Sequence, residues 1–180
     1  MAGHSIETQR LQLRELEVAD CSDAYVAWMN DPEVKRFLET RFQPEQTIDS
    51  IRGFVASIRA KPNEVLFGIF LKEAGRHIGN IKVGPISAIH LCGDVSLLVG
   101  ARDCWGAGYA AEAISAVSRY AFSSLGVHKL SASMYSPNVG STKAFLKTGY
   151  RQEGLRRDHY MLDGERCDIV ELGLLRSDLP

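Results

Sequence analysis

One stretch in the middle of the chain restricts the possible folds more than any other. An apolar segment at residues 94–100 leads to the turn Gly106-Ala107-Gly108, and a helical pattern with apolar residues at 110, 114, 117, 121 and 125 follows at once. Gly106 and Gly108 lack a Cβ atom, so the backbone there can adopt positive φ and approach a bulky anion. Because the first turn of a helix presents unpaired N–H groups, this strand, turn and helix are expected to bind a pyrophosphate.

The common nucleotide-binding motifs do not fit this stretch. No Gly-Lys-Ser/Thr follows the turn, and the third glycine of a dinucleotide fingerprint is missing. A strand-to-helix connection that simply needs small residues would have the same appearance. Other segments must therefore decide between a phosphate site and a structural turn.

The composition is that of one soluble domain spanning residues 1–180. Hydrophobic residues make up 45% of the chain and charged residues 24%, which is ordinary for a globular protein. The formal net charge is −1, so no overall field attracts nucleic acid or an anionic membrane. No apolar run is long enough to cross a bilayer. We expect neither nucleic acid nor a membrane as a partner.

The four cysteines, Cys21, Cys92, Cys104 and Cys167, form no Cys-x-x-Cys pair, and the start of the chain lacks a signal-peptide pattern. These features predict a cytoplasmic protein. His90 and Cys92 alone do not make a metal site, so no metal is expected. Cys104 lies in the turn, where a helix N-terminus can lower the pKa of its thiol, or where it simply fills space.

Polar and apolar periodicity predicts the remaining elements. Strands are expected at residues 8–14, 65–71, 76–83, 94–100, 129–135, 150–157 and 166–175. Helices are expected from an N-cap at Asp20 to a stop at residues 30–32, from Pro44 or Thr47 to Arg59, from Gly108 onward, and over residues 141–148. This order predicts a mixed α+β sheet with mostly antiparallel neighbours and one β-α-β crossover at the glycine turn.

Three segments resemble one family. Residues 105–113, Trp-Gly-Ala-Gly-Tyr-Ala-Ala-Glu-Ala, resemble the acetyl-CoA pyrophosphate loop of the GNAT N-acetyltransferases, in the branch of the ribosomal-protein acetyltransferases. Residues 138–150 resemble the family's Asn-x-x-Ser helix that ends in Gly-Tyr, and residues 150–157 with Asp163-Gly164 are typical of this branch. The resemblance covers nearly the whole chain. It implies the GNAT fold, with helices flanking a sheet that splays at the cofactor site.

The resemblance also implies acetyl-CoA as a co-substrate and a set of residues that bind it. These are Leu98, Val99, Gly100, Trp105, Gly106, Ala107, Gly108, Tyr109, Ala110, Asn138, Ser141, Lys143 and Phe145. A backbone N–H near residues 98–100 is expected to stabilise the oxyanion that develops on the thioester carbonyl. Asn138 is expected beside the pantetheine arm, although it could equally cap a helix.

The chain departs from the family at two positions. Asp103 stands where many members carry Arg or Gln, with Arg102 next to it, which puts a phosphate contact there in doubt. Phe145 stands where many members carry a tyrosine that acts as general acid. The hydroxyl expected near the thioester sulfur is therefore that of Ser141, unless Ser141 only caps its helix.

Deprotonation of the attacking amine needs a base, for which the sequence offers several candidates. Asp94 lies in a strand where related enzymes often carry a carboxylate, and His77 has a suitable intrinsic pKa. A solvated Asp94, a surface His77 and a water chain in place of any base are the alternatives. Glu112 is more simply explained by its place in the first turn of a helix.

The resemblance implies that residues 33–42 line the acceptor side of the active site, and we expect residues 77–82 to do so as well. The predicted substrate-binding residues are Arg41, Phe42 and Asn80. Residues 30–34 and 77–82 look like those of family members that acetylate an amino sugar. We therefore expect a small-molecule amine, acetylated by direct attack in a ternary complex that requires no metal. A protein N-terminal amine, another small amine, or a non-catalytic acyl-CoA-binding module are the alternatives. A homodimer is plausible for the family.

Overall fold

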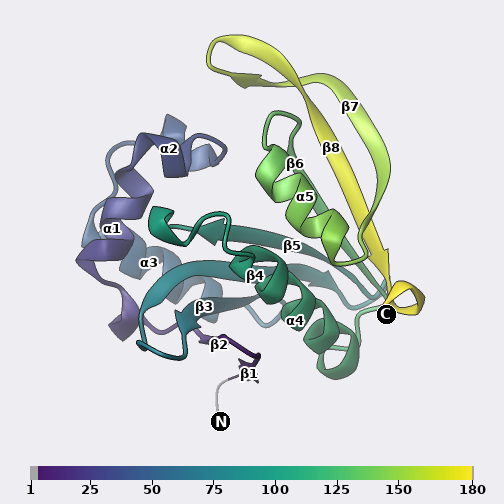
Figure 1. The fold of residues 1–180 in the computed structure, drawn as a ribbon, viewed down its shortest axis with the longest axis horizontal. Helices are drawn as coiled ribbons and strands as arrows, with labels where there is room; N and C mark the ends of the chain where they lie inside the picture. The colour runs from purple at the N-terminus through teal and green to yellow at the C-terminus, as the bar shows by residue number, and fades with distance from the viewer. Residues whose placement is uncertain (1–3, 180) are drawn as a thin grey trace.

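The structure, a computed structural model, describes residues 4–179 and contains one eight-stranded mixed sheet (Figure 1). The strands are β1 (Ser5–Glu7), β2 (Leu11–Glu15), β3 (Val65–Leu71), β4 (His77–Ser87), β5 (Cys92–Val99), β6 (Lys129–Tyr135), β7 (Arg151–Leu162) and β8 (Glu165–Leu175). The α-helices are α1 (Asp23–Asn30), α2 (Pro32–Lys35), α3 (Ile48–Arg59), α4 (Tyr109–Ser124) and α5 (Val139–Lys147). No helix within residues 4–179 is both long and apolar enough to span a membrane.

The order of strands in the sheet is β1-β2-β3-β4-β5-β6-β8-β7. Neighbours are antiparallel except β5 and β6, which are parallel and are joined by α4, as the predicted crossover requires. β5 and β6 pair only where Cys92, Gly93 and Asp94 face Lys129, Leu130 and Ser131. Beyond this short pairing the two strands separate. The predicted α+β fold, splayed next to the glycine turn, is confirmed.

Helices cover both faces of the sheet. Phe67 and Ile69 of β3 pack into the same core as Ile114 and Val117 of α4. Leu66 and Phe70 of the same strand pack instead with residues of α1 and α3, because successive side chains of a strand point to opposite faces. Figure 1 shows α4 and α5 on the near face and α3 behind the sheet.

The helix α3 illustrates how local sequence sets these elements. Ile51, Val55 and Ile58 recur at helical spacing and are buried against the sheet. The Thr47 side chain accepts a hydrogen bond from Ser50 N, and Ser50 Oγ accepts one from Thr47 N, which forms a reciprocal cap. Of the two predicted starting points, Thr47 is therefore the one that the structure uses.

Three predictions near the beginning of the chain are corrected. β1 was not expected, and it pairs only with β2 at the edge of the sheet. The N-cap of α1 is Ser22, not Asp20, because the Asp20 carboxylate accepts two hydrogen bonds from Arg14 at 2.6 and 2.7 Å. Pro32 does not only end α1: it is the first residue of α2, and Asp31 caps that helix.

Candidate active site

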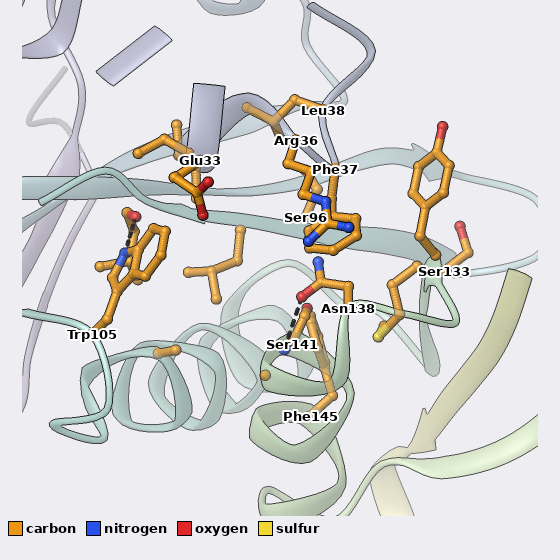
Figure 2. Close-up of a pocket in the computed structure, with 18 of the residues that line it drawn as sticks. Glu33, Arg36, Phe37, Leu38, Ser96, Trp105, Ser133, Asn138, Ser141 and Phe145 are labelled. Carbon is orange, nitrogen blue, oxygen red and sulfur yellow. Dashed lines mark hydrogen bonds between the residues drawn. The ribbon is translucent and has the colours of Figure 1, made fainter. Parts of the chain in front are cut away.

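A cavity of about 660 Å³ lies where β5 and β6 separate (Figure 2). Its first part is lined by Leu98, Val99, Cys104, Trp105, Gly106, Gly108, Tyr109, Ala110, Asn138, Gly140, Ser141 and Phe145. Its second part is lined by Glu33, Val34, Arg36, Phe37, Leu38, Glu39, Val95, Ser96, Leu97, Ser133, Met134, Tyr135, Tyr160 and Ile169. The volume is in the range of small-molecule sites.

The main chain of β5 offers hydrogen-bonding groups to this cavity. Gly100 N donates to Ile78 O of β4 at 2.9 Å. N–H groups alternate in direction along an antiparallel strand, so the Leu98 N–H also points to β4, whereas those of Leu97 and Val99 point toward β6. Val99 O accepts a hydrogen bond from Trp105 Nε1 at 2.7 Å, which agrees with this direction. Because β6 has separated, the Leu97 and Val99 N–H groups are available to a ligand.

The glycine turn has the backbone shape that the sequence predicted. Gly106 and Gly108 adopt φ of 75° and 84°, a region that residues with a Cβ rarely adopt. Gly108 is the N-cap of α4, so the first N–H groups of that helix have no partner within it. Gly106, Gly108, Tyr109 and Ala110 line the cavity, whereas Ala107 does not. The turn and the helix start therefore present unpaired N–H groups at the lining of the cavity, the kind of groups that bind an anion.

Arg10 supports this turn from outside the cavity. Its Nη1 donates to Ala107 O at 3.0 Å, and its Nε donates to Glu112 Oε2 at 2.7 Å. The guanidinium lies over the Tyr109 ring, 4.3 Å from the centroid. Glu112 is thus held by an ion pair at the start of α4, as its position suggested, and it does not line the cavity. Sequence reasoning missed Arg10 because its partners lie about a hundred positions away.

The helix α5 brings three of the predicted residues to the cavity. Asn138 is its N-cap, and Asn138 Oδ1 accepts a hydrogen bond from Ser141 N at 3.3 Å. The alternative in which the Ser141 side chain caps the helix is therefore wrong. Phe145 is 2% exposed and packs edge-on against Tyr150, with ring centroids 4.9 Å apart. Figure 2 shows Asn138, Ser141 and Phe145 on the same side of the cavity.

The far end of the cavity is aromatic, and charged side chains of both signs lie beside it. Phe37, Tyr135 and Tyr160, which we call the aromatic patch, have successive ring centroids 6.1 and 5.4 Å apart. Glu39 accepts a hydrogen bond from the Tyr135 hydroxyl at this end, whereas Glu33 lies between Phe37 and Trp105 (Figure 2). Of the predicted segment 33–42, residues 33, 34 and 36–39 line the cavity, whereas the patch comes mainly from β6 and β7, which the sequence did not single out for the acceptor side.

Comparison with known proteins shows the family to which this chain belongs. The family model described as the acetyltransferase (GNAT) domain matches residues 10–151. The chain belongs to the GNAT acetyltransferase family. It is 30% identical over 165 residues to YoaA of Bacillus subtilis (strain 168), named an uncharacterized N-acetyltransferase, with 91% of this chain and 92% of YoaA covered.

Two solved GNAT structures share the fold. Mycobacterium smegmatis RimJ in complex with CoA-disulfide has a TM-score of 0.85 at 18% identity, covering 100% of this chain and 92% of that chain. Spermidine N-acetyltransferase from Vibrio cholerae, in complex with CoA and spermine, has a TM-score of 0.83 at 20% identity, covering 95% and 98%. The resemblance to the GNAT family is confirmed, and RimJ shares the fold.

Several residues proposed from the GNAT resemblance lie away from the cavity. The Gly100 N–H is bonded to Ile78 O, and a Cβ at Gly100 would lie 2.2 Å from the Trp28 ring, so this residue packs against α1. Lys143 is on the exposed face of α5. The Ala107 carbonyl faces Arg10. None of these three lines the cavity.

Arg41 and Phe42 do not line the cavity either, although they follow a segment that does. Arg41 donates to Tyr135 Oη at 2.8 Å, to Met161 O at 2.9 Å and to Leu38 O at 3.0 Å. The Arg41 guanidinium lies 4.2 Å from the centroid of the Phe42 ring, which is 66% exposed. Arg41 therefore joins residues 38–42 to β6 and β7.

His77 and Asn80 of β4 face the layer of α1 and α3. His77 Nε2 lies 2.9 Å from both Gly79 O and Asn80 Oδ1, and its ring stacks on Phe70 at 4.7 Å. Burial lowers the pKa of His77, which favours the neutral ring. His77 Nδ1 and Asn80 Nδ2 are buried without a hydrogen-bond partner among the described residues. Neither side chain lines the cavity, so residues 77–82 do not form its acceptor side.

Asp94 lies at the edge of the site. It does not line the cavity, but Ser96, two residues further along β5 and therefore on the same face, does. Packing around the Asp94 carboxyl raises its pKa, and nearby Lys82 opposes the rise. Asp94 thus stays a candidate base that would need an intervening group to reach the cavity.

The two unusual residues of the turn have structural roles. Asp103 accepts two hydrogen bonds from Arg76, at 2.6 and 2.7 Å, so its side chain is directed at β4 and not at the anion site. Burial raises the pKa of the Cys104 thiol, which is 6% exposed, and this favours packing over reactivity. Within residues 4–179 no cluster of three or more His, Cys, Asp or Glu side chains could hold a metal ion.

Proposed function

We propose that this GNAT protein transfers an acetyl group from acetyl-CoA to a primary amine of a small molecule, such as an amino sugar, by direct attack in a ternary complex. The observation that carries the proposal is the continuous cavity that joins an anion site at Gly106–Gly108, free N–H groups on β5, and an aromatic far end with charged side chains beside it. These three features match the diphosphate, the pantetheine arm with its thioester, and the acceptor amine in that order.

The first part of the cavity suits acetyl-CoA. The unpaired N–H groups at the start of α4 would bind the pyrophosphate, where the positive end of the helix favours negative charge. The Leu97 and Val99 N–H groups would bind the pantetheine arm and the thioester carbonyl. The oxyanion donor that we expected within residues 98–100 is therefore narrowed to Val99, because the other two N–H groups in that range are directed at β4.

The transfer proceeds by addition and elimination. The acceptor ammonium loses a proton, its nitrogen attacks the carbonyl carbon, and the C–S bond breaks to release CoA thiolate. Of the two protons that the nitrogen loses, one leaves before attack and the other when the amide forms; one of them ends on the CoA sulfur. In this proposal the Ser141 hydroxyl donates a hydrogen bond to the departing thiolate, since Phe145 has no hydroxyl to do so.

The far end of the cavity favours a small acceptor with a flat apolar face. One face of the Tyr135 ring is covered by the Arg41 guanidinium, 4.7 Å from its centroid, and the Tyr135 hydroxyl donates to Glu39 Oε1 at 2.5 Å. A second contact, from Arg36 to Asp163 at 2.9 Å, joins α2 to the turn between β7 and β8. These contacts tie α2 and residue 39 to β6 and to the turn between β7 and β8, which favours a slender molecule over a folded protein surface.

An acceptor screen tests the proposal. The protein would be incubated with acetyl-CoA and, in separate reactions, nucleotide-linked amino sugars, short peptides with a free N-terminus, and spermidine. Mass spectrometry would detect the acetylated amine, and thiol release would give the rate. Fast acetylation of an amino sugar supports the proposal. Preference for a peptide would favour the N-terminal alternative, and CoA binding with no product would favour a non-catalytic module. Cytoplasmic location and a homodimer stay predictions.

A further inference from the structure

Glu33 differs from the other charged groups that line the cavity. It lies in the first turn of α2, and its side chain is exposed. Arg36 also lines the cavity but is paired with Asp163, and the Glu39 carboxylate accepts the Tyr135 hydroxyl. Among the residues that the structure describes, no hydrogen bond or ion pair involves the Glu33 carboxylate. It is thus the carboxylate of the lining that is free to bind a ligand.

Figure 2 shows where this carboxylate points. It extends from α2 into the cavity, with Trp105 on one side and Phe37 on the other, and it faces the side that α4 and α5 form. Trp105 is hydrogen-bonded to Val99 O, so it marks the end of β5 at which the thioester is expected. Glu33 therefore lies between the thioester end of the cavity and the aromatic patch.

This inference rests on the function proposed above. We propose that Glu33 binds the acceptor's ammonium group and accepts one proton from it before the nitrogen attacks. The proton passes from the nitrogen to a Glu33 carboxylate oxygen, directly or through one water, and leaves a neutral amine and a neutral carboxylic acid. The free electron pair of the nitrogen then attacks the thioester carbonyl. Glu33 returns this proton to solvent when the product leaves, so no further reactant is needed.

The aromatic patch completes the acceptor site in this proposal. The Tyr135 ring is held in place through its hydroxyl, and Phe37 and Tyr160 flank it. Since Arg41 already covers the Tyr135 ring with positive charge, the patch is better suited to the neutral part of the acceptor than to a second cation. The site thus recognises a molecule with one ammonium at Glu33 and a flat neutral ring on Phe37 and Tyr160.

The test compares Glu33→Gln with Asp94→Asn and with Glu45→Gln as a matched control. Glu45 is exposed and lies outside the cavity, so its loss removes the same charge without touching the site. With the best amine from the screen, Glu33→Gln is expected to lower kcat/KM by about 10²- to 10⁴-fold, the range of general-base effects. With no base at position 33 only the free amine reacts, so kcat/KM of Glu33→Gln should fall in proportion to the free-amine fraction below the pKa of the amine. Glu33→Asp is expected to restore part of the rate.

Calorimetry with CoA separates this inference from the proposed function. CoA should bind Glu33→Gln and the wild-type protein equally, with equal melting temperatures. A Glu33→Gln protein with wild-type kcat/KM and pH profile, or one that loses CoA binding, would overturn the role of Glu33 while acetyl transfer stands. A loss of kcat/KM of this size in Asp94→Asn but not in Glu33→Gln would move the base to Asp94. If the wild-type protein acetylates no amine, the proposed function itself fails.

Discussion

Replacing Ser141 by alanine separates a catalytic hydroxyl from a structural one. The cap of α5 is made by Asn138, whose Oδ1 accepts from the Ser141 main chain, and this bond survives the substitution. Alanine is also a better helix former than serine, by a few tenths of a kcal/mol. We therefore expect the free energy of unfolding of Ser141→Ala to stay within about 0.5 kcal/mol of the wild type. A change of that size shifts the melting temperature by only about 1–2 °C in a chain of this length.

The rate is expected to respond differently. If the Ser141 hydroxyl assists the departing thiolate, its loss lowers kcat by about 10- to 100-fold, at the lower end of general-acid effects because a thiol of pKa about 8.5 is already a fair leaving group. Thiol release at saturating substrates measures kcat, and thermal denaturation measures stability.

Asn138→Ala is the control for the cap, and it should cost about 1 kcal/mol of stability. Full turnover in a stable Ser141→Ala protein would refute this role and leave protonation of the thiolate to water.

Three other substitutions test the roles that the structure assigns. Gly108→Val should weaken CoA binding by about tenfold or more in calorimetry and destabilise the protein by about 1–2 kcal/mol, because φ is 84° at that position. The control Gly53→Val, at an open position of α3, should leave CoA binding unchanged. Arg41→Ala should lower the free energy of unfolding by about 1–3 kcal/mol and leave the KM for acetyl-CoA unchanged; a selective rise in acceptor KM without loss of stability would contradict a structural role. Burial lowers the pKa of His77, so the neutral ring stabilises the fold above about pH 6.5, and this stabilisation is lost as the pH falls toward the pKa of the folded state. Denaturation as a function of pH should therefore show that the free energy of unfolding falls less in acid for His77→Gln than for the wild type. An equal fall in both proteins would contradict this role.

Elements with a strong local pattern could be predicted closely from the sequence. β3 and β6 have the predicted bounds, Val65–Leu71 and Lys129–Tyr135, because an apolar or alternating run determines them locally. β1 escaped prediction because three mostly exposed residues carry no such pattern and depend on pairing with β2. The start of α1 was misplaced because an ion pair with Arg14 engages the Asp20 carboxylate, and that pairing is tertiary.

The candidate site also has parts that local sequence predicts and parts that depend on distant segments. The glycine turn and the Asn138 helix are local motifs, and the sequence shows both. The acceptor end is built from segments distant in the sequence, where the face on which a side chain lies decides its role. His77 and Asn80 lie on the face that packs against α1 and α3, and Arg41 is directed at Met161 O, so residue type alone predicted them for a cavity that they do not line. Glu33 falls within the predicted segment 33–42, but nothing local separates it from its charged neighbours, and it stands out only when the cavity is seen.

Amide hydrogen exchange with and without CoA tests most directly whether the cofactor occupies the gap between β5 and β6. Saturating CoA is expected to slow exchange in peptides covering residues 95–101 and 105–112, because the Leu97 and Val99 N–H groups and those at the start of α4 gain hydrogen-bond partners. The open groove between β1 and α4, lined by Ser5 and Arg119 among others, should exchange as before. Unchanged exchange at residues 95–101 in a CoA-saturated protein, or protection confined to that groove, would contradict the assignment.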